Sequence, residues 1–367
     1  MKIALAHFQW FNEFKGGAER YLEQAYDLLK DKVDLHLVTG YKKTEDGIPD
    51  NRYNCHYFSN SVLLKHLQYY VHTRNVLKKI NPDIIHTMTL STYVKKPFIF
   101  WSTQIDYTDS DFWLLNTPMY SQLAKRVFKK ADVIQVHTEC LKKQIFDKFD
   151  LPEEKIKLIE QPVDQNLRID KDLRDKTRKE LDVCDKTVVY FPARIIPNKR
   201  QDLLIKSLAH VKKNIRNDIV VMISGMIQDE EYFDYLKKLA HGLPVIFKPN
   251  VESICGLYNA CDVVVHAREV TESGGSIIAE AMHLGKPLVL SDVDSFREVS
   301  KGNALFFKPG DVNDFAAKIE QIYNDAGTRN SLIREGFSID KKFYSPSSYC
   351  KKQLEVYESV IKGNKIG

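Results

Sequence analysis

The sequence predicts an α/β protein with two doubly wound domains, each a parallel sheet between layers of helices. The chain has 367 residues, and at roughly 150 residues per domain that length corresponds to about two domains. Short apolar runs alternate with amphipathic stretches, and this alternation occurs twice, before and after a polar segment at 164–186. We therefore expect an N-terminal domain over 1–165, a second domain over 166–345, and a last helix over 346–367 that crosses back to the first.

The first half of the chain supplies the elements of one such domain. Apolar runs of this length that lie between helices are typical of parallel strands buried on both faces. The expected strands are 3–6, 35–38, 84–86, 98–101 and 133–136, and the expected helices are 18–29 and about 61–79.

The second half repeats the pattern, and its strand ends are where a ligand is expected. Parallel doubly wound sheets bind ligands beyond the carboxyl ends of their strands, and two such domains can face each other across a central cleft. The expected strands are 187–191, 219–223, 245–247, 263–266, 287–290 and 304–307, and the expected helices are 201–213, 229–241, 277–284, 312–325 and 348–362.

Composition excludes several classes of function. The chain has 54 Lys and Arg against 49 Asp and Glu, an excess too small to predict nucleic acid as a partner. No apolar run approaches the roughly 18 residues of a membrane span, and the first apolar run is too short for a secretory signal. Six scattered cysteines with no CxxC argue against a zinc or redox site. We expect a cytoplasmic protein.

Two loops after expected strands have the residues of an anion site. Gly16 and Gly17 precede the first helix, where free backbone N–H groups favour an anion; an ordinary tight turn is the alternative. Arg194 and Lys199 follow the first strand of the second half. A guanidinium fork and a point cation together suit a diphosphate, although a solvated basic loop would have the same composition.

A third loop has two carboxylates around a glycine pair. Glu272 and Glu280 are eight residues apart, and Gly274 and Gly275 lie between them at the start of the helix that follows strand 263–266. Carboxylates accept hydrogen bonds from sugar hydroxyls, and helix-start amides hold phosphate.

Taken together, these segments resemble the donor-site signature of the retaining GT-B glycosyltransferases of family 4, the glycosyl transferases group 1. The resemblance rests on 257–267, 272–282 and 285–292, on the glycine loop at 16–20, on 131–134 and 158–164, and on Arg194 and Lys199. It covers nearly the whole chain in the expected order. It implies the GT-B fold, two Rossmann-like domains facing a central cleft, and transfer of a sugar, as by a hexosyltransferase, from a UDP-sugar or GDP-sugar in polysaccharide biosynthesis.

The resemblance also implies roles for individual residues. Arg194 and Lys199 would stabilise the leaving diphosphate, and Glu272 would hold the transferred sugar; these three form the expected catalytic set. Glu280 would hold the ribose. The implied donor-binding set comprises Gly16, Gly17, Arg194, Lys199, Asn250, Val251, Glu272, Ser273, Gly274, Gly275, Ser276 and Glu280.

Several positions depart from the family pattern, among them Arg200, where the family usually has a small residue after Lys199. The family usually has an aromatic residue where this chain has Gly274, which changes the shape expected for the sugar pocket. The family also often has a histidine after the strand at 98–101, and here none follows. No catalytic histidine is carried over.

No metal or other cofactor is expected. The Asp-x-Asp triplets at 109–111 and 292–294 lack the strand context of a metal site, so solvated loops are favoured. The resemblance implies a front-face displacement in which the leaving phosphate takes the acceptor proton.

The expected partners are a nucleotide-sugar donor and a glycan or lipid-linked acceptor. The segment 119–130 interleaves basic and apolar residues, which suits a peripheral contact with the inner membrane face; an amphipathic helix docked on its own sheet is the alternative. Two other functions stay open: a soluble glycosyltransferase acting on a small metabolite, and a non-catalytic sugar-nucleotide-binding subunit.

Overall fold

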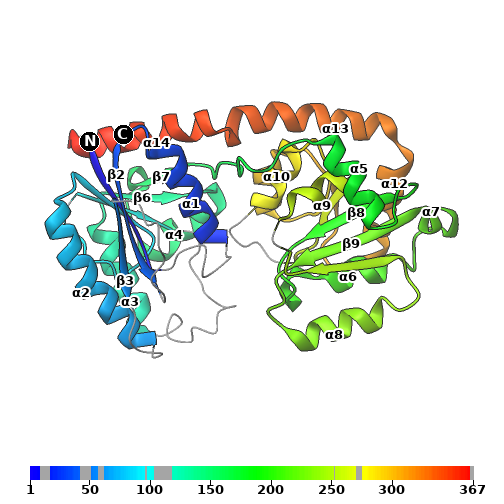
Figure 1. The fold of residues 1–367 in the computed structure, drawn as a ribbon, viewed down its shortest axis with the longest axis horizontal. Helices are drawn as coiled ribbons and strands as arrows, with labels where there is room; N and C mark the ends of the chain where they lie inside the picture. Colours follow the sequence, from blue (N-terminus) through cyan, green and yellow to red (C-terminus); the bar gives the residue numbers. More distant parts are fainter. Residues whose placement is uncertain are drawn as a thin grey trace. The chain divides into compact units, whose positions relative to one another are not determined.

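The computed structural model describes residues 1–8, 17–41, 51–56, 62–95, 97–102, 118–251, 253–269 and 275–363 (Figure 1). The chain forms two compact units. The first unit contains Met1–Pro162 and Pro346–Gly367, and the second contains Val163–Ser345. Each is a parallel sheet covered by helices on both faces, so the predicted doubly wound α/β fold is confirmed.

In the first unit the strands run in the order β3-β2-β1-β4-β5-β6-β7, and every described pair is parallel. The order changes direction between β1 and β4, which is the switch point of a doubly wound sheet. The strands are β1 (Lys2–His7), β2 (Asp34–Tyr41), β3 (Arg52–His56), β4 (Ile84–Thr87), β5 (Phe98–Trp101), β6 (Val133–Val136) and β7 (Ile156–Leu158).

Alternate residues of these strands face two separate cores. Ile3 and Leu5 pack with α1 and α14, whereas Ala4 and Ala6 pack on the other face with α2, α3 and α4. The last helix therefore belongs to the first unit's core, where Tyr357 is fully buried. The helices are α1 (Gly17–Leu29), α2 (Val62–Ile80), α3 (Pro118–Lys130), α4 (Glu139–Phe149) and α14 (Pro346–Ile361).

The second unit repeats the design with the strand order β10-β9-β8-β11-β12-β13, again parallel throughout the described pairs. Its switch point lies between β8 and β11. The strands are β8 (Thr187–Pro192), β9 (Ile219–Gly225), β10 (Val245–Pro249), β11 (Val263–His266), β12 (Leu288–Ser291) and β13 (Leu305–Phe307).

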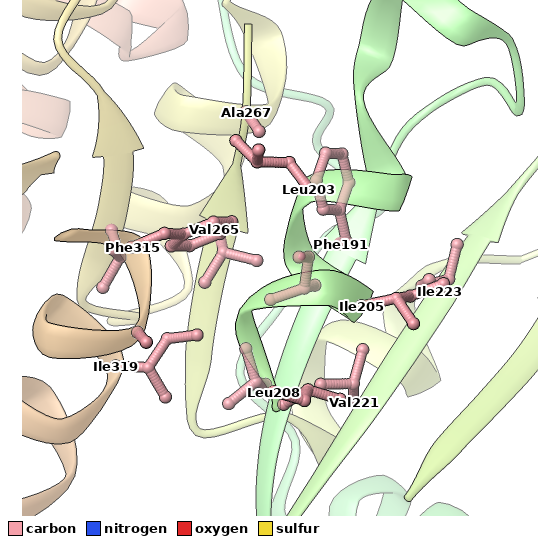
Figure 2. Close-up of a cluster of buried hydrophobic side chains, with 14 of the residues drawn as sticks. Phe191, Leu203, Ile205, Leu208, Val221, Ile223, Val265, Ala267, Phe315 and Ile319 are labelled. Carbon is pink, nitrogen blue, oxygen red and sulfur yellow. The ribbon is translucent and has the colours of Figure 1, made fainter. Parts of the chain in front are cut away.

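Two cores also flank this second sheet. Figure 2 shows one of them, in which Phe191 and Val265 meet Leu203 of α6 and Phe315 of α12. Tyr190 and Val264 point into the other core, which includes α9 and α10. The helices are α5 (Lys171–Glu180), α6 (Gln201–Ser207), α7 (Lys213–Asp218), α8 (Glu230–Leu239), α9 (Cys255–Ala260), α10 (Ser276–His283), α11 (Asp294–Ser300), α12 (Val312–Asn324) and α13 (Ala326–Ile339).

The polar segment at 164–186 contains the helix α5, which its highly charged sequence did not indicate. Asp170 caps the helix by accepting from Leu173 N. Arg174 and Arg178 then reach across to the end of α9, where they donate to backbone carbonyls and to Asp262. The charges that made this segment look like a linker are used to pack it.

The two ends of the second unit lie beside each other. The backbone N–H of Val163, the first residue of the second unit, donates to the carbonyl of Tyr344 at 3.1 Å. Tyr344 precedes Ser345, the last residue of that unit, and its hydroxyl donates to Val299 O at 2.6 Å.

Candidate functional site

Of the site residues predicted in the second unit, those that the structure describes include Arg194, Lys199 and Glu280, which follow neighbouring strands of its sheet. Arg194 follows β8 by two residues, and Lys199 ends a one-turn 3-10 helix, Pro197–Lys199, just beyond it. Glu280 lies on α10, which follows the loop after β11. Strands β8 and β11 are the pair at which the strand order reverses, so this edge is where a doubly wound sheet binds its ligand.

Arg194 has a fixed backbone and an exposed side chain. Its carbonyl accepts a hydrogen bond at 2.8 Å from the side-chain amide of Gln201, which is fully buried at the start of α6. Its guanidinium Nη1 donates to Gln228 Oε1 at 2.8 Å. The main chain therefore holds the guanidinium at the strand edge, while water still reaches it.

Gly225 allows the chain around Arg194 to approach β9. Its φ of +148° is disfavoured for residues with a Cβ, and a Cβ added there would lie 1.9 Å from the carbonyl oxygen of Ala193. That carbonyl belongs to the residue before Arg194, and the backbone of Ala193 bonds to Ser224 at 2.9 Å. Glycine is thus required at this strand end for the observed position of Arg194.

Lys199 and Arg200 are neighbours with different surroundings. Lys199 is 5% exposed, whereas Arg200 has a left-handed backbone with φ of +56°. The Arg200 guanidinium pairs with Asp202 at 3.1 Å and with Glu269, which follows β11. The pair with Glu269 joins the chain after β8 to the chain after β11 at the switch point.

His266 lies at the end of β11, and nearby buried cations affect the pKa of its imidazole. Burial first, and then the charges of Arg268 and Lys199, lower the pKa of His266 well below its ordinary value. The imidazole is therefore neutral at pH 7. Arg268 is 8% exposed, and its guanidinium lies 5.8 Å from the ring centre of Phe296. The edge of β11 thus has two buried cations beside a neutral ring.

Glu280 is a buried carboxylate on the helix that begins at Ser276. It is 3% exposed, and its Oε2 accepts from the hydroxyl of Tyr258 at 2.8 Å. Burial raises the pKa of Tyr258 well above its ordinary value, so the phenol stays a donor. Gly275 caps α10, and a Cβ at Gly275 would come within 2.8 Å of Val299.

Some of the remaining predicted residues lie in the part of the chain that the structure describes, and others do not. Asn250 follows β10 with φ of +54°, and it ties β9 to β10 because its N–H donates to Gly225 O at 3.1 Å. Val251 follows it and packs at the edge of a core. In the first unit, Gly17 begins α1. Gly16, Glu272, Ser273 and Gly274 lie outside the described residues.

Sequence reasoning did not assign a role to Gln201, Gly225 or Arg268. Gln201 and Gly225 act on the main chain of Arg194 and the residue before it, through contacts 7 and more than 30 positions apart in sequence. A glycine at the carboxyl end of an expected strand was the available signal for Gly225. Arg268 lies between the two motif segments 257–267 and 272–282 and belongs to neither.

The acidic triplets give no metal cluster in the described chain. Asp292 accepts from Arg297 Nη2 at 2.8 Å, so this carboxylate is ion-paired. The triplet at 109–111 lies outside the described residues. Within the described residues, no three His, Cys, Asp or Glu side chains are grouped as metal ligands. No helix there is both long and apolar enough to cross a membrane.

Two family models match the chain in succession. The model described as Glycosyltransferase Family 4 matches residues 15–167, and the model described as Glycosyl transferases group 1 matches residues 173–338. The matched segments correspond closely to the two halves of the fold.

Individual proteins resemble the chain more distantly. An uncharacterized glycosyltransferase of Methanocaldococcus jannaschii, MJ1607, is 25% identical over 63% of this chain and 60% of its own length. The putative glycosyltransferase YtcC of Bacillus subtilis is 24% identical over 65% of this chain and 62% of its own length. The matches therefore span about three fifths of these relatives.

Solved structures share the fold over almost the full chain. Anabaena Alr3699/HepE, solved in complex with UDP and glucose, has a TM-score of 0.80 at 19% identity, covering 98% of this chain and 100% of that chain. WaaG, a glycosyltransferase involved in lipopolysaccharide biosynthesis, has a TM-score of 0.74 at 14% identity, covering 99% and 100%. With both family models matched in order and the two-sheet fold shared, this chain belongs to the GT-B glycosyltransferases of family 4, the glycosyl transferases group 1.

Proposed function

We propose that this protein transfers a sugar from a nucleotide-sugar donor to an acceptor. The observation that carries the proposal is that Arg194 and Lys199 both follow β8, at the switch point of the second sheet. Helix α10, which contains Glu280, follows the neighbouring strand β11. Family membership supports the reaction class. A relative of the same fold was solved with UDP and glucose, which supports a nucleotide-sugar as donor.

The departing nucleoside diphosphate sets the electrostatic demand at this site. Negative charge develops on the phosphates as the glycosidic bond breaks, and fixed cations are effective when they need no reorganisation. Arg194 offers a guanidinium fork held by its backbone, and Lys199 offers a buried point charge. The backbone amides at Gly275 and Ser276, and those at Gly16 and Gly17, would add uncharged donors.

Carboxylates would hold the hydroxyl groups of the donor. Glu280 would accept from the ribose, because a carboxylate can accept several hydrogen bonds, of which Tyr258 supplies one. Glu272 would hold the transferred sugar, with Ser273 and Gly274 beside it. Asn250 and Val251 would meet the base through their backbone at the end of β10.

We further propose that transfer retains the anomeric configuration and needs no metal. The acceptor oxygen bonds to the anomeric carbon on the face from which the phosphate oxygen leaves, and that phosphate oxygen takes the acceptor proton. The transition state has oxocarbenium character. No protein general base is needed in this scheme.

The acceptor we propose is a glycan or a lipid-linked sugar. A soluble glycosyltransferase acting on a small metabolite is the second candidate. Supplying labelled donor together with either a solvent-extracted lipid fraction or a soluble metabolite fraction separates the two. Label that enters the organic phase supports the lipid-linked acceptor, and label found only in a small water-soluble product contradicts it.

A donor-hydrolysis screen tests the central proposal. Purified protein is incubated with a panel of UDP-sugars and GDP-sugars, and release of the nucleoside diphosphate is measured. We expect release from one donor, and Arg194→Ala or Lys199→Ala should each lower turnover roughly 100-fold or more. Lys176→Ala is a matched control, since its side chain is 73% exposed on α5. Near-normal turnover in both site variants would refute the phosphate assignment, and donor binding without turnover would favour a non-catalytic subunit.

A further inference from the structure

Helix α2 has an outward-facing stripe that its own unit does not cover. Leu64, Leu67, Val71, Arg74 and Lys78 recur at spacings of three and four, so they share one face of the helix. All five are exposed, and the three aliphatic side chains keep 48%, 58% and 49% of their surface accessible. The stripe is therefore apolar in its first half and basic in its second half.

The opposite face of α2 supplies the core contacts. Tyr69, Thr73, Leu77 and Ile80 are buried, and Leu77 and Ile80 belong to the core between α2, α3 and the sheet. A surface helix normally has polar residues opposite such a face. Three consecutive outward positions of α2 have aliphatic residues instead, so folding of the first unit does not account for them.

The surrounding charge has one sign. Helices α2 and α3 each contain four Lys or Arg residues and no Asp or Glu, although the whole chain has 54 basic and 49 acidic residues. The eight cations are Lys65, Arg74, Lys78, Lys79, Lys125, Arg126, Lys129 and Lys130. None of the eight is ion-paired in the part of the chain that the structure describes.

Helix α3 shares this side of the sheet but contributes charge more than apolar surface. Its Ala124 and Phe128 are buried in the same core as Leu77 of α2. Its four cations are exposed. Within 119–130, these two apolar side chains therefore fit the alternative of an amphipathic helix docked on its own sheet. The larger exposed apolar surface lies on α2. Figure 1 shows α2 at the surface of the first unit.

We propose that α2 and α3 form a docking surface for an anionic lipid bilayer. Leu64, Leu67 and Val71 enter the boundary between headgroups and acyl chains, and the cations of both helices contact the anionic headgroups. The proposal rests on the lipid-linked acceptor proposed above and deepens it, because it identifies the surface that brings the enzyme to its acceptor.

Charge favours a bilayer over a second copy of this chain. Two copies that met through α2 and α3 would bring two surfaces with four cations per helix, and no carboxylate, against each other. An anionic bilayer is complementary to the cations and also removes the aliphatic side chains from water. Nucleic acid would match the charge but would leave the aliphatic half of the stripe without an apolar partner.

Vesicle co-sedimentation of the full chain tests the proposal. The probes are neutral phosphatidylcholine vesicles and vesicles that contain about a third phosphatidylglycerol. The anionic lipid gives the second kind of vesicle a negative surface potential, which attracts polybasic segments. One variant replaces the aliphatic stripe, L64S/L67S/V71S, and a second removes charge from α3, K125Q/R126Q/K129Q/K130Q. The matched control is F146S/I169S, which changes apolar side chains that are 44% and 64% exposed elsewhere.

We expect binding to anionic vesicles and not to neutral ones. The aliphatic and charge variants should each bind at least about tenfold more weakly, as lost apolar burial and lost cations predict, and the control should bind as the wild type does. Failure of the wild type to sediment with anionic vesicles would overturn the proposal. Vesicle binding by L64S/L67S/V71S as strong as that of the wild type would also overturn it. So would a wild-type dimer in sedimentation velocity that is lost in this variant.

Donor hydrolysis in the absence of vesicles separates this proposal from the proposed function. All stripe positions are exposed on α2, so hydrolysis and the thermal unfolding midpoint should be unchanged in L64S/L67S/V71S. Vesicle binding without any donor hydrolysis would contradict the transferase and leave the docking surface supported. Hydrolysis without vesicle binding would contradict the docking surface alone.

Discussion

Replacement of Arg178 by methionine should weaken the second unit more than any surface substitution on α5. The guanidinium is 9% exposed, and it donates to Ala260 O at 2.7 Å, to Val183 O at 2.9 Å, to Cys184 O at 3.2 Å and to Lys186 O. It also pairs with Asp262 at 3.1 Å. Methionine fills much of the same volume and makes none of these bonds.

The expected loss follows from the groups that stay behind. Each buried acceptor left without a donor costs about 1 kcal/mol. Asp262 keeps its pair with Arg174 at 2.6 Å and its bond from Val188 N at 2.8 Å, so its carboxylate is not stranded. Val183 O also keeps its bond from Lys186 N at 3.2 Å, so three carbonyls lose their donor. With about 1 kcal/mol for each of these and a similar amount for the lost Asp262 pair, the total should be about 4 kcal/mol.

Urea unfolding provides the assay. A slope of about 2 kcal/mol/M for a unit of this size converts the loss to a midpoint shift of about 2 M. Far-UV circular dichroism follows both units, whereas tryptophan fluorescence follows the first unit, because Trp10, Trp101 and Trp113 all precede Pro162. Lys176→Met on the same helix is the control. A shift in Arg178→Met no larger than in this control would refute the reasoning.

Three further predictions concern the site and its supports. Gly225→Ala should abolish most donor turnover and lower stability by about 2 to 4 kcal/mol, because its Cβ would strike the Ala193 carbonyl; calorimetry showing an unchanged unfolding temperature would contradict the required close approach. The hydrogen bond to Asp340 raises the pKa of His283 above its ordinary value, so the native state holds the proton more tightly. Stability from this pair should be complete below about pH 6.5 and fall as pH rises through the folded pKa; unfolding curves in which His283→Gln keeps the same fall would count against it. Turnover should survive EDTA, and strict restoration by Mn²⁺ would contradict the metal-free proposal.

The parallel architecture was predictable because its strands are buried on both faces. Runs such as Phe98–Trp101, Val133–Val136 and Val263–His266 have no polar alternation, and the structure gives those strands the same bounds. The edge strand Arg52–His56 was not recognised, since an edge position tolerates polar residues. Helix α5 was missed because its mean polarity resembles that of a linker.

At the candidate site, sequence order was enough to bring Arg194 and Lys199 to one strand edge, because every doubly wound sheet presents its carboxyl ends together. It was not enough to show what fixes them. Gln201 and Gly225 act through contacts that depend on how β8 meets β9 and α6, and no local pattern encodes those distances.

The bond between Val163 and Tyr344 makes the second unit an insertion with adjoining ends. The first unit is interrupted at Pro162 and resumes at Pro346, and the chain leaves and returns at points joined by one backbone hydrogen bond. Domains with neighbouring termini are those that tolerate transplantation. The first unit can therefore exchange residues 163–345 for the equivalent unit of a relative without a new path for its own chain. Such chimaeras would test whether donor choice moves with the transplanted unit.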